Sequence, residues 1–461
     1  MIKLTIVFLI LLSSFLRFYR LDELMPFIGD QGLFYLPARD ILIEGVIPLV
    51  GPETSHIWIH HGAHWTYVLA VILWFFNFNP VPPAYFIAGL GVATVWLLYK
   101  TVAEIFSKRI ALITAFFYAT SPLVVLNARM PYHTSPIPFL TILLILAICR
   151  WLNGNVYYFP LITFLVGVLY NHEITTFVLF IPIIVILFYG FIKKKPWTKK
   201  LIDKKIIFYS LVSLLVPMTP FILYDLNNGY KQTFGFIVWV LYRIFKFPIN
   251  VFNGSDVSME FFVHVTQLIF APSLLTSLAI LFFSFIYFIY IVYKKLKKRN
   301  LDKGHVLLFL YIVIPTAGLF AHRSPIEADT LLISPFVIMV IAVFFDKLLF
   351  FRIIKIPVFA AIILIGTINS YYLLSTEYLT NIGSSSRITF EERIKAVENI
   401  KKLVGGKQYS LVGKGELSNF SMFTMNYEYI LWWKGYPTSK EKVDLKIVVL
   451  EKNGDIFVSK E

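Results

Sequence analysis

The sequence predicts an all-α membrane protein with many spans, followed by a small α/β appendage. Of its 461 residues, 58% are hydrophobic and only 15% are charged, and the mean hydropathy is +0.73. A soluble core could not bury so much apolar surface, so much of it must face lipid. The net charge of +15 comes from short Lys and Arg clusters between apolar runs, which is typical of cytoplasmic loops and argues against nucleic-acid binding. The single cysteine, Cys149, excludes an intrachain disulfide and a thiolate metal site.

Eleven apolar runs are candidates for membrane spans, since a spanning α-helix needs about 20 residues. The first run resembles a signal peptide, but Arg17-Phe18-Tyr19-Arg20 follows it where a cleavage site needs small residues, so we expect an uncleaved helix. The runs lie near residues 3–20, 83–106, 110–128, 135–152, 156–171, 174–192, 206–224, 264–293, 305–321, 329–346 and 353–375.

A further apolar run, residues 64–78, is short for a crossing and is followed by three prolines. If it does not cross and the N-terminus is cytoplasmic, the basic clusters near 193–205 and 294–299 are also cytoplasmic. The same topology gathers the polar residues between the spans at the outer surface. We therefore expect residues 64–78 to lie flat in the outer interface or to re-enter it.

Two domains follow from this topology for a multi-pass protein of the cell membrane. The expected ranges are 1–375 for the transmembrane domain, 21–82 for its first outer loop, and 376–461 for an extracytoplasmic C-terminal domain. In the second domain, apolar spacing predicts a helix over 391–404 and short strands over 408–413 and 445–451.

The first outer loop contains the strongest candidate for a catalytic residue, Asp30. It lies between Gly29 and Gln31-Gly32, shortly after the first apolar run. The glycines would let a substrate approach the backbone, and a carboxylate at a membrane edge can have a raised pKa. These properties suit a general base for an incoming hydroxyl. The alternative is an exposed aspartate that caps a helix beginning near Gly32.

Four histidines in the same loop resemble a metal site: His56, His60, His61 and His64. His60 and His64 would share one face of a helix. A structural zinc site usually has four ligands in a defined arrangement, and only one carboxylate, Glu53, is near. We therefore expect no required cofactor, leave a divalent metal open, and favour hydrogen bonding to a sugar or phosphate or a purely interfacial role.

Other polar residues are predicted at the same surface. Arg129 ends the third apolar run, where a guanidinium needs a partner; a lipid phosphate suits it, and snorkelling to ordinary headgroups is the alternative. The remaining candidates are either substrate-binding residues or structural pairs: His133, His172 with Glu173, and Arg323 with Glu327 and Asp329.

Several motifs carry a resemblance to a known family: Leu16-Arg17-Phe18-Tyr19-Arg20-Leu21-Asp22, Gly29-Asp30-Gln31-Gly32, Ala38-Arg39-Asp40-Ile41-Leu42, Pro48-Leu49-Val50-Gly51-Pro52, His61-Gly62, and Tyr224-Asp225-Leu226-Asn227-Asn228-Gly229. In these the chain resembles the polyprenyl-phosphate-sugar-dependent glycosyltransferases with the GT-C fold, which include relatives of the protein O-mannosyltransferases and of the lipid A aminoarabinose transferase.

The resemblance implies a bundle of some eleven to thirteen spans with juxtamembrane helices in the first outer loop. It also implies a polyprenyl-phosphate monosaccharide donor, an inverting reaction, and an aspartate base at the position of Asp30. The chain departs from the family where Gln31 replaces a second acid, where His133 replaces an aspartate of the mannosyltransferases, and where Ala63 replaces a proline. These departures concern the sugar and the acceptor more than the reaction class.

The resulting hypothesis is a membrane glycosyltransferase that acts on a glycan, lipid or protein acceptor. Asp30 would take the proton of the acceptor hydroxyl, and Arg129 with Arg323 would hold the departing lipid phosphate. His61, His133 and His172 would bind the donor. The alternatives are a transferase with a metal at the histidines and a transporter or flippase of a lipid-linked or polar substrate. The concentration of ionisable residues at one face favours the enzyme over the transporter.

Overall fold

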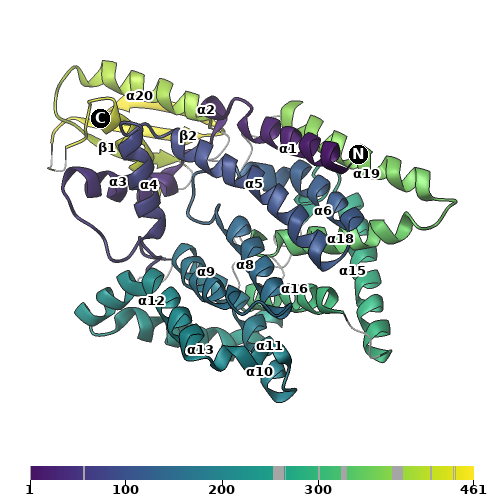
Figure 1. Cartoon of the computed structure of the whole chain (residues 1–461). Helices are drawn as coiled ribbons and strands as arrows, with labels where there is room; N and C mark the ends of the chain where they lie inside the picture. Colours follow the sequence, from purple (N-terminus) through teal and green to yellow (C-terminus); the bar gives the residue numbers. More distant parts are fainter. Residues whose placement is uncertain are drawn as a thin grey trace.

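The molecule is a bundle of helices that ends in a small three-stranded sheet (Figure 1), as the sequence predicts. The computed structural model describes residues 2–54, 58–252, 264, 266–298, 302–322, 330–375, 388–415, 418–439, 441 and 443–461.

Each of the eleven predicted apolar runs contains helix. Proline near the first turn of several of these helices fixes φ where no intrahelical N–H bond is needed. The helices of the bundle are α1 (Ile2–Phe18), α5 (Pro82–Ile105), α6 (Lys108–Thr120), α7 (Pro122–Asn127), α8 (Ile137–Leu152), α9 (Tyr158–His172), η1 (Ile174–Leu179), α10 (Ile181–Ile192), α11 (Pro196–Lys199), η2 (Lys200–Ile202), α12 (Lys204–Asn227), α13 (Lys231–Phe252), α15 (Leu274–Lys297), α16 (Lys303–His322), α18 (Ser334–Leu348) and α19 (Lys355–Ser375).

Within the described residues, 6 helical segments are long and apolar enough to cross a membrane. These segments are Pro82–Ile105, Ile174–Ile192, Lys204–Asn227, Leu274–Lys297, Lys303–Phe320 and Lys355–Leu374. The other predicted spans coincide with shorter or broken helices, so eleven spans remain a prediction. Helix α4 (His64–Phe75) has 12 residues, too few for a full crossing, and packs against α3 and α5.

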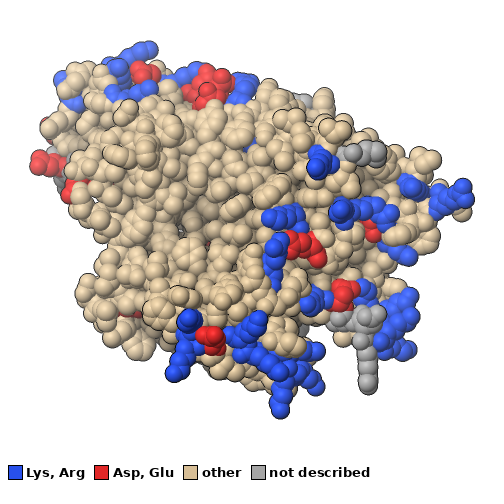
Figure 2. Space-filling model, viewed as in Figure 1, with Lys and Arg blue, Asp and Glu red and all other residues tan. Residues whose placement is uncertain are grey.

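On the face that Figure 2 shows, charged side chains gather along the upper edge and toward the right and lower right, and a broad surface without charge lies between them. The residues at the ends of the helices include both charged side chains and side chains that cap the helices. Ser107 accepts a hydrogen bond from the Ile110 N–H at the start of α6, and Asp203 does the same for the Lys205 N–H at the start of α12. Basic residues end α15, where they also complement the helix dipole.

The first predicted outer loop forms two short helices before α4, which are α2 (Leu21–Leu24) and α3 (Gly29–Ile43). Helix α3 begins at Gly29, and not near Gly32 as a capping role for Asp30 would require. The Gln31 side chain accepts a hydrogen bond from the Ile28 N–H at 2.7 Å, so Gln31 caps the helix. Asp30 therefore lies in the first turn of the helix.

The C-terminal module, residues 388–461, contains α20 (Phe390–Val404), α21 (Met425–Trp433) and the strands β1 (Ser410–Gly415), β2 (Lys446–Lys452) and β3 (Asp455–Lys460). Strand β1 pairs with β2 in parallel, with Val412 opposite Val448, and β2 pairs with β3 in antiparallel orientation. The sequence predicted α20, β1 and β2 but missed α21 and β3. Asn453-Gly454, both with positive φ, forms the hairpin turn that could have revealed β3.

This module packs directly on the start of α3 (Figure 1). The Asn426 side-chain amide donates to the Phe27 carbonyl at 2.8 Å, and the Tyr429 hydroxyl donates to the Phe78 carbonyl at 2.8 Å. The Phe27 ring lies edge-on to Tyr35 and to Tyr429. The helix that carries Asp30 is therefore clamped between the bundle and the module.

Candidate active site

Asp30 is a half-buried carboxylate in the first turn of α3. Burial raises the pKa of its carboxyl group, and the neighbouring His133 and a hydrogen bond with the Tyr132 side chain offset part of that rise. The helix N-terminus also favours a negative charge at this position. Asp30 thus combines proximity to two polar rings with a raised proton affinity, which are the properties of a general base.

The glycines beside Asp30 serve a different purpose from the one that the sequence suggests. A Cβ atom on Gly29 would lie 2.2 Å from the Met422 carbonyl oxygen, and one on Gly32 would lie 2.3 Å from the Asn426 nitrogen. The absence of a side chain lets the backbone of the C-terminal module approach α3, so the expectation that these glycines make room for a substrate is wrong.

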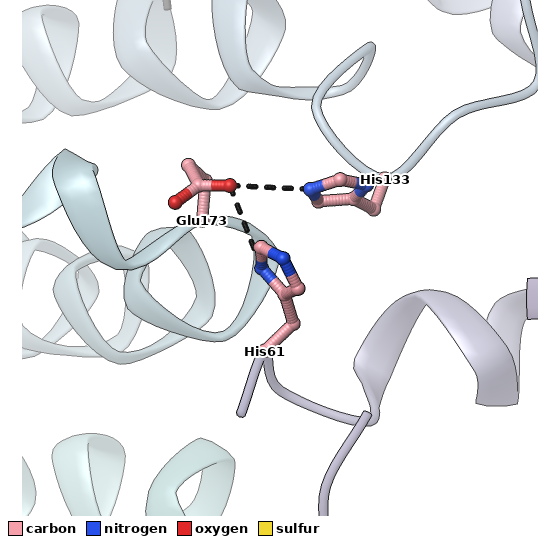
Figure 3. Close-up of side chains that lie close together, drawn as sticks. All are labelled: His61, His133 and Glu173. Atoms are coloured by element: carbon pink, nitrogen blue, oxygen red, sulfur yellow. Dashed lines mark hydrogen bonds and ion pairs between the residues drawn. The ribbon is translucent and has the colours of Figure 1, made fainter. Parts of the chain in front are cut away.

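Three side chains from distant parts of the chain, His61, His133 and Glu173, point toward one another (Figure 3). The Glu173 Oε2 atom lies 3.2 Å from His133 Nε2 and 3.5 Å from His61 Nδ1. The other oxygen of Glu173 accepts the Thr175 N–H at 3.3 Å, which fixes the carboxylate at the start of η1. We call His61, His133 and Glu173 the His-His-Glu cluster.

Electrostatics hold this cluster in defined protonation states. Burial lowers the pKa of His61 to about 4, so its imidazole is neutral at pH 7. Burial alone would raise the pKa of Glu173, but His61, the hydrogen bond from His133 and the Thr175 N–H together hold it below its usual value. Glu173 is therefore an anion that can orient a ring N–H of each histidine.

Backbone contacts position the cluster. The His61 N–H donates to the Pro52 carbonyl at 2.9 Å, and the Gly62 N–H donates to the Asn171 carbonyl at 3.0 Å at the end of α9. A Cβ atom on Gly62 would lie 2.4 Å from the Asn171 side chain. The His61-Gly62 motif thus needs its glycine because the loop is pressed against α9.

The cluster is continuous with α3 and with the end of α9. The His133 ring stacks on Phe34 of α3 at 4.8 Å between centroids, and it lies 4.6 Å from the His61 ring. His172 Nδ1 lies 2.8 Å from the His133 carbonyl. The structure therefore brings four predicted site residues together, namely Asp30, His61, His133 and His172.

Glu173 is the residue of this site whose role the sequence does not reveal, since beside His172 it predicts either a substrate-binding pair or a structural helix-start pair, and no contact with His61 or His133. Its partners lie 112 and 40 residues earlier in the chain, and no local pattern reveals such contacts. The useful clue was its place directly after His172 at the predicted outer surface, beside a histidine that was already a candidate.

The sequence leaves a metal at the four loop histidines open and predicts that His60 and His64 share one face of a helix; that shared face is wrong. His60 lies in a β-bridge with Glu53 and not on a helix, and its Nε2 atom lies 3.2 Å from the Tyr224 hydroxyl. His64 instead begins α4. His56 lies outside the described residues, as does Arg323. Among the described residues, the group that could hold a metal ion is the His-His-Glu cluster, whose ligand atoms lie within 4.8 Å of one another.

Arg129 has partners other than the predicted lipid phosphate. Its guanidinium is fully buried and donates to the carbonyls of Leu16, Arg17 and Tyr19 at 2.8 to 3.2 Å. Carbonyls at a helix C-terminus have no intrahelical partner, and Arg129 satisfies them for α1. We therefore assign Arg129 to the attachment of α1 and leave it out of the proposed donor site.

An apolar cavity of about 400 Å³ lies beside the cluster, between η1, α13 and α16. Its lining begins at Thr175, which contacts Glu173, and includes Trp239 and Arg243 of α13 and Ala317 of α16. Helix α13 also covers the first loop, because its Gln232 side chain donates to the His60 carbonyl at 2.9 Å. The site thus adjoins a space suited to a hydrocarbon chain.

Comparison with known proteins agrees with this architecture. Residues 60–224 match the family described as dolichyl-phosphate-mannose-protein mannosyltransferase. A search of curated proteins finds no match.

Two solved structures are similar to the chain over most of its length. ArnT from Cupriavidus metallidurans, bound to undecaprenyl phosphate, has a TM-score of 0.60 and 8% identity over 97% of this chain and 92% of its own. The oligosaccharyltransferase of Archaeoglobus fulgidus, in complex with Zn and sulfate, has a TM-score of 0.55 and 14% identity over 94% of this chain. The chain spans 62% of the length of that archaeal enzyme. The predicted resemblance is confirmed: the chain has the GT-C fold of the polyprenyl-phosphate-sugar glycosyltransferases.

Proposed function

We propose that this protein is a membrane glycosyltransferase that moves a monosaccharide from a polyprenyl-phosphate donor to an acceptor hydroxyl, with inversion at the sugar C1. The observation that carries the proposal is the half-buried Asp30 carboxylate beside His133. His133 belongs to the His-His-Glu cluster, and an apolar cavity adjoins that cluster. The match to a mannosyltransferase family and the undecaprenyl phosphate in the similar ArnT structure support a lipid-phosphate donor.

In the proposed reaction Asp30 takes the proton of the acceptor hydroxyl as that oxygen attacks the sugar C1. The bond between C1 and the phosphate oxygen breaks, and polyprenyl phosphate leaves with the electron pair. His61, His133 and His172 bind sugar and phosphate oxygens, and the Glu173 anion orients the first two rings. A base in this position acts by general base catalysis. We also propose that this site and the C-terminal module face the outside and that the N-terminus is cytoplasmic.

The polyprenyl chain is proposed to lie in the apolar cavity, which places its phosphate between Arg243 and the cluster. Arg243 lines the cavity and its guanidinium lies 6.0 Å from the Trp239 ring centroid, so it is held at the wall. A guanidinium matches phosphate oxygens, so we assign to Arg243 the phosphate-binding role that the sequence-based hypothesis assigns to Arg129.

Filling this cavity should weaken donor use. In Ala317→Trp the indole would occupy much of the space, so we expect KM for a long-chain polyprenyl-phosphate sugar to rise roughly tenfold, with a smaller effect on a short-chain analogue. The matched control is Ala360→Trp, at an exposed position of α19 outside the cavity. Steady-state kinetics with both chain lengths would check this. Equal KM values in the two variants would remove the cavity from the donor site.

The proposed chemistry requires no metal, but the cluster has the donor set of a divalent-cation site. Two imidazoles and a carboxylate with nearby ligand atoms suit Zn²⁺ or Mn²⁺, and a bound cation would neutralise charge on the lipid phosphate. We expect transfer to stay within about twofold of its starting rate after chelation, because Asp30 can act without a metal. The cluster would instead be assigned to a metal if chelation stopped transfer, added Zn²⁺ or Mn²⁺ restored it, and the Glu173→Gln variant could not be restored in this way.

The experiment that tests the proposed function is incubation of the purified protein with a panel of polyprenyl-phosphate monosaccharides in liposomes. A transferase releases polyprenyl phosphate and transfers or hydrolyses the sugar of at least one member. A transporter or flippase, the alternative, would move the intact donor to the other leaflet without cleaving it. Mass spectrometry of the lipid distinguishes these outcomes.

A further inference from the structure

At the end of the bundle away from Asp30, the start of α6 and the ends of α15 and α18 enclose two adjoining cavities of about 430 and 580 Å³. Helix α6 starts at this end with Lys108 and leads through α7 toward His133, so the cavities are separate from the candidate active site. In the predicted topology this end is cytoplasmic.

Basic side chains from three helices line these cavities. They are Arg109 from α6, Lys294, Lys295 and Lys298 from the end of α15, and Lys347 from α18. Two carboxylates face them: Asp346 pairs with Arg109, and Asp302 pairs with Lys295 and with His305. Five cations against two anions leave an excess of three positive charges.

The excess lies on Lys294, Lys298 and Lys347. In the part of the chain that the structure describes, these three ammonium groups make no ion pair with a carboxylate. Lys294 and Lys347 lie over aromatic rings, with Nζ 5.6 Å from the Tyr290 centroid and 5.3 Å from the Phe351 centroid. All three lysines line the cavity of about 430 Å³, which we call the hollow. Three ammonium groups around this hollow form a site for an anion with several oxygens, such as a phosphate.

The surroundings favour a phosphate that belongs to a lipid. The cavity of about 430 Å³ is also lined by Ile291, Val343 and Phe350. Close to its lysines, Tyr290 and Tyr293 of α15 and Phe351 in the turn after α18 are exposed. Exposed aromatic rings beside lysines are typical of the membrane interface. Basic pockets between membrane helices at this level bind anionic headgroups.

We propose that this hollow binds the headgroup of an anionic glycerophospholipid, with Lys294, Lys298 and Lys347 as the phosphate-binding residues. The bound lipid joins the ends of α15 and α18, which the excess positive charge would otherwise push apart. This site is independent of the glycosyl-transfer site and of the proposed function.

The test is lipid binding to the full chain in detergent, followed by native mass spectrometry, with phosphatidylglycerol, phosphatidylcholine and inorganic phosphate as probes. The pocket variant combines Lys294→Gln, Lys298→Gln and Lys347→Gln. The control variant combines Lys193→Gln, Lys199→Gln and Lys200→Gln, which removes the same charge from exposed lysines outside the hollow.

We expect phosphatidylglycerol to bind the wild type more tightly than phosphatidylcholine. Its affinity should fall roughly 100-fold in the pocket variant and stay within about threefold in the control. Equal losses in both variants, equal binding of the two lipids, or full competition by inorganic phosphate would each overturn the proposal. If the triple variant does not fold, Lys298→Gln alone, at an exposed side chain, should still lower the affinity about fivefold, and no change would overturn it.

Discussion

Asp30→Asn is expected to lower the rate of sugar transfer by roughly 100-fold to 10,000-fold, the usual contribution of a general base. The amide keeps the size and hydrogen-bonding shape of the carboxylate, so the start of α3 and the docked module should be preserved. It cannot accept the proton of the acceptor hydroxyl. Donor affinity, measured by titration with the polyprenyl-phosphate sugar, should stay close to that of the wild type.

The matched control is Asp40→Asn in the same helix. Asp40 pairs with Arg39 at 2.6 Å and lies near the C-terminal end of α3, away from His133. Substitutions of such partly exposed groups usually change stability by less than about 0.5 kcal/mol, so its transfer rate should stay within about twofold. Equal losses in the two variants would show that charge on α3, and not the base, is what matters.

Gly32→Ala should release the C-terminal module from the helix that carries Asp30. The new methyl group would lie 2.3 Å from the Asn426 nitrogen and 2.3 Å from the Met425 carbonyl carbon. Backbone atoms cannot turn away as a side chain can, so α3 and α21 must separate. We expect a loss of about 1–3 kcal/mol in stability, the range for overpacked cores, and a loss of transfer because Asp30 moves.

The control for this change is Gly89→Ala, since Gly89 lies within α5 and a Cβ atom there meets nothing within 4 Å. Alanine favours helix by roughly 1 kcal/mol over glycine, so this variant should be as stable as the wild type or more stable. Thermal unfolding and transfer assays on the two variants check both expectations. A Gly32→Ala protein with wild-type stability would contradict the clamp between the module and α3.

The sequence was sufficient for the parts of the fold that follow from composition and charge. Long apolar runs predicted the helices of the bundle, and the basic clusters between them predicted that Asp30, His133 and His172 would share one side. In the structure Asp30 and His172 both lie beside His133. This agrees with the predicted topology, which places the three loops that carry these residues on the same side of the membrane.

The sequence could not supply the partners that form only after folding. The orphan carbonyls at the end of α1 occupy Arg129, although its position at a membrane edge suggested a phosphate ligand. Glu173 holds two histidines from remote loops, and Gly32 fits against a module about 390 residues later in the chain. Such long-range contacts leave no periodic pattern.

The most direct test of Asp30 as the base is the pH dependence of transfer in a single turnover with prebound donor. Because burial raises the Asp30 pKa, the wild-type rate should be full above that pKa and fall as the pH drops through it, at a pH above the ordinary aspartate value of about 3.9. The residual rate of Asp30→Asn should lack this fall. An acidic fall at the ordinary aspartate value, or the same fall in Asp30→Asn, would contradict the account.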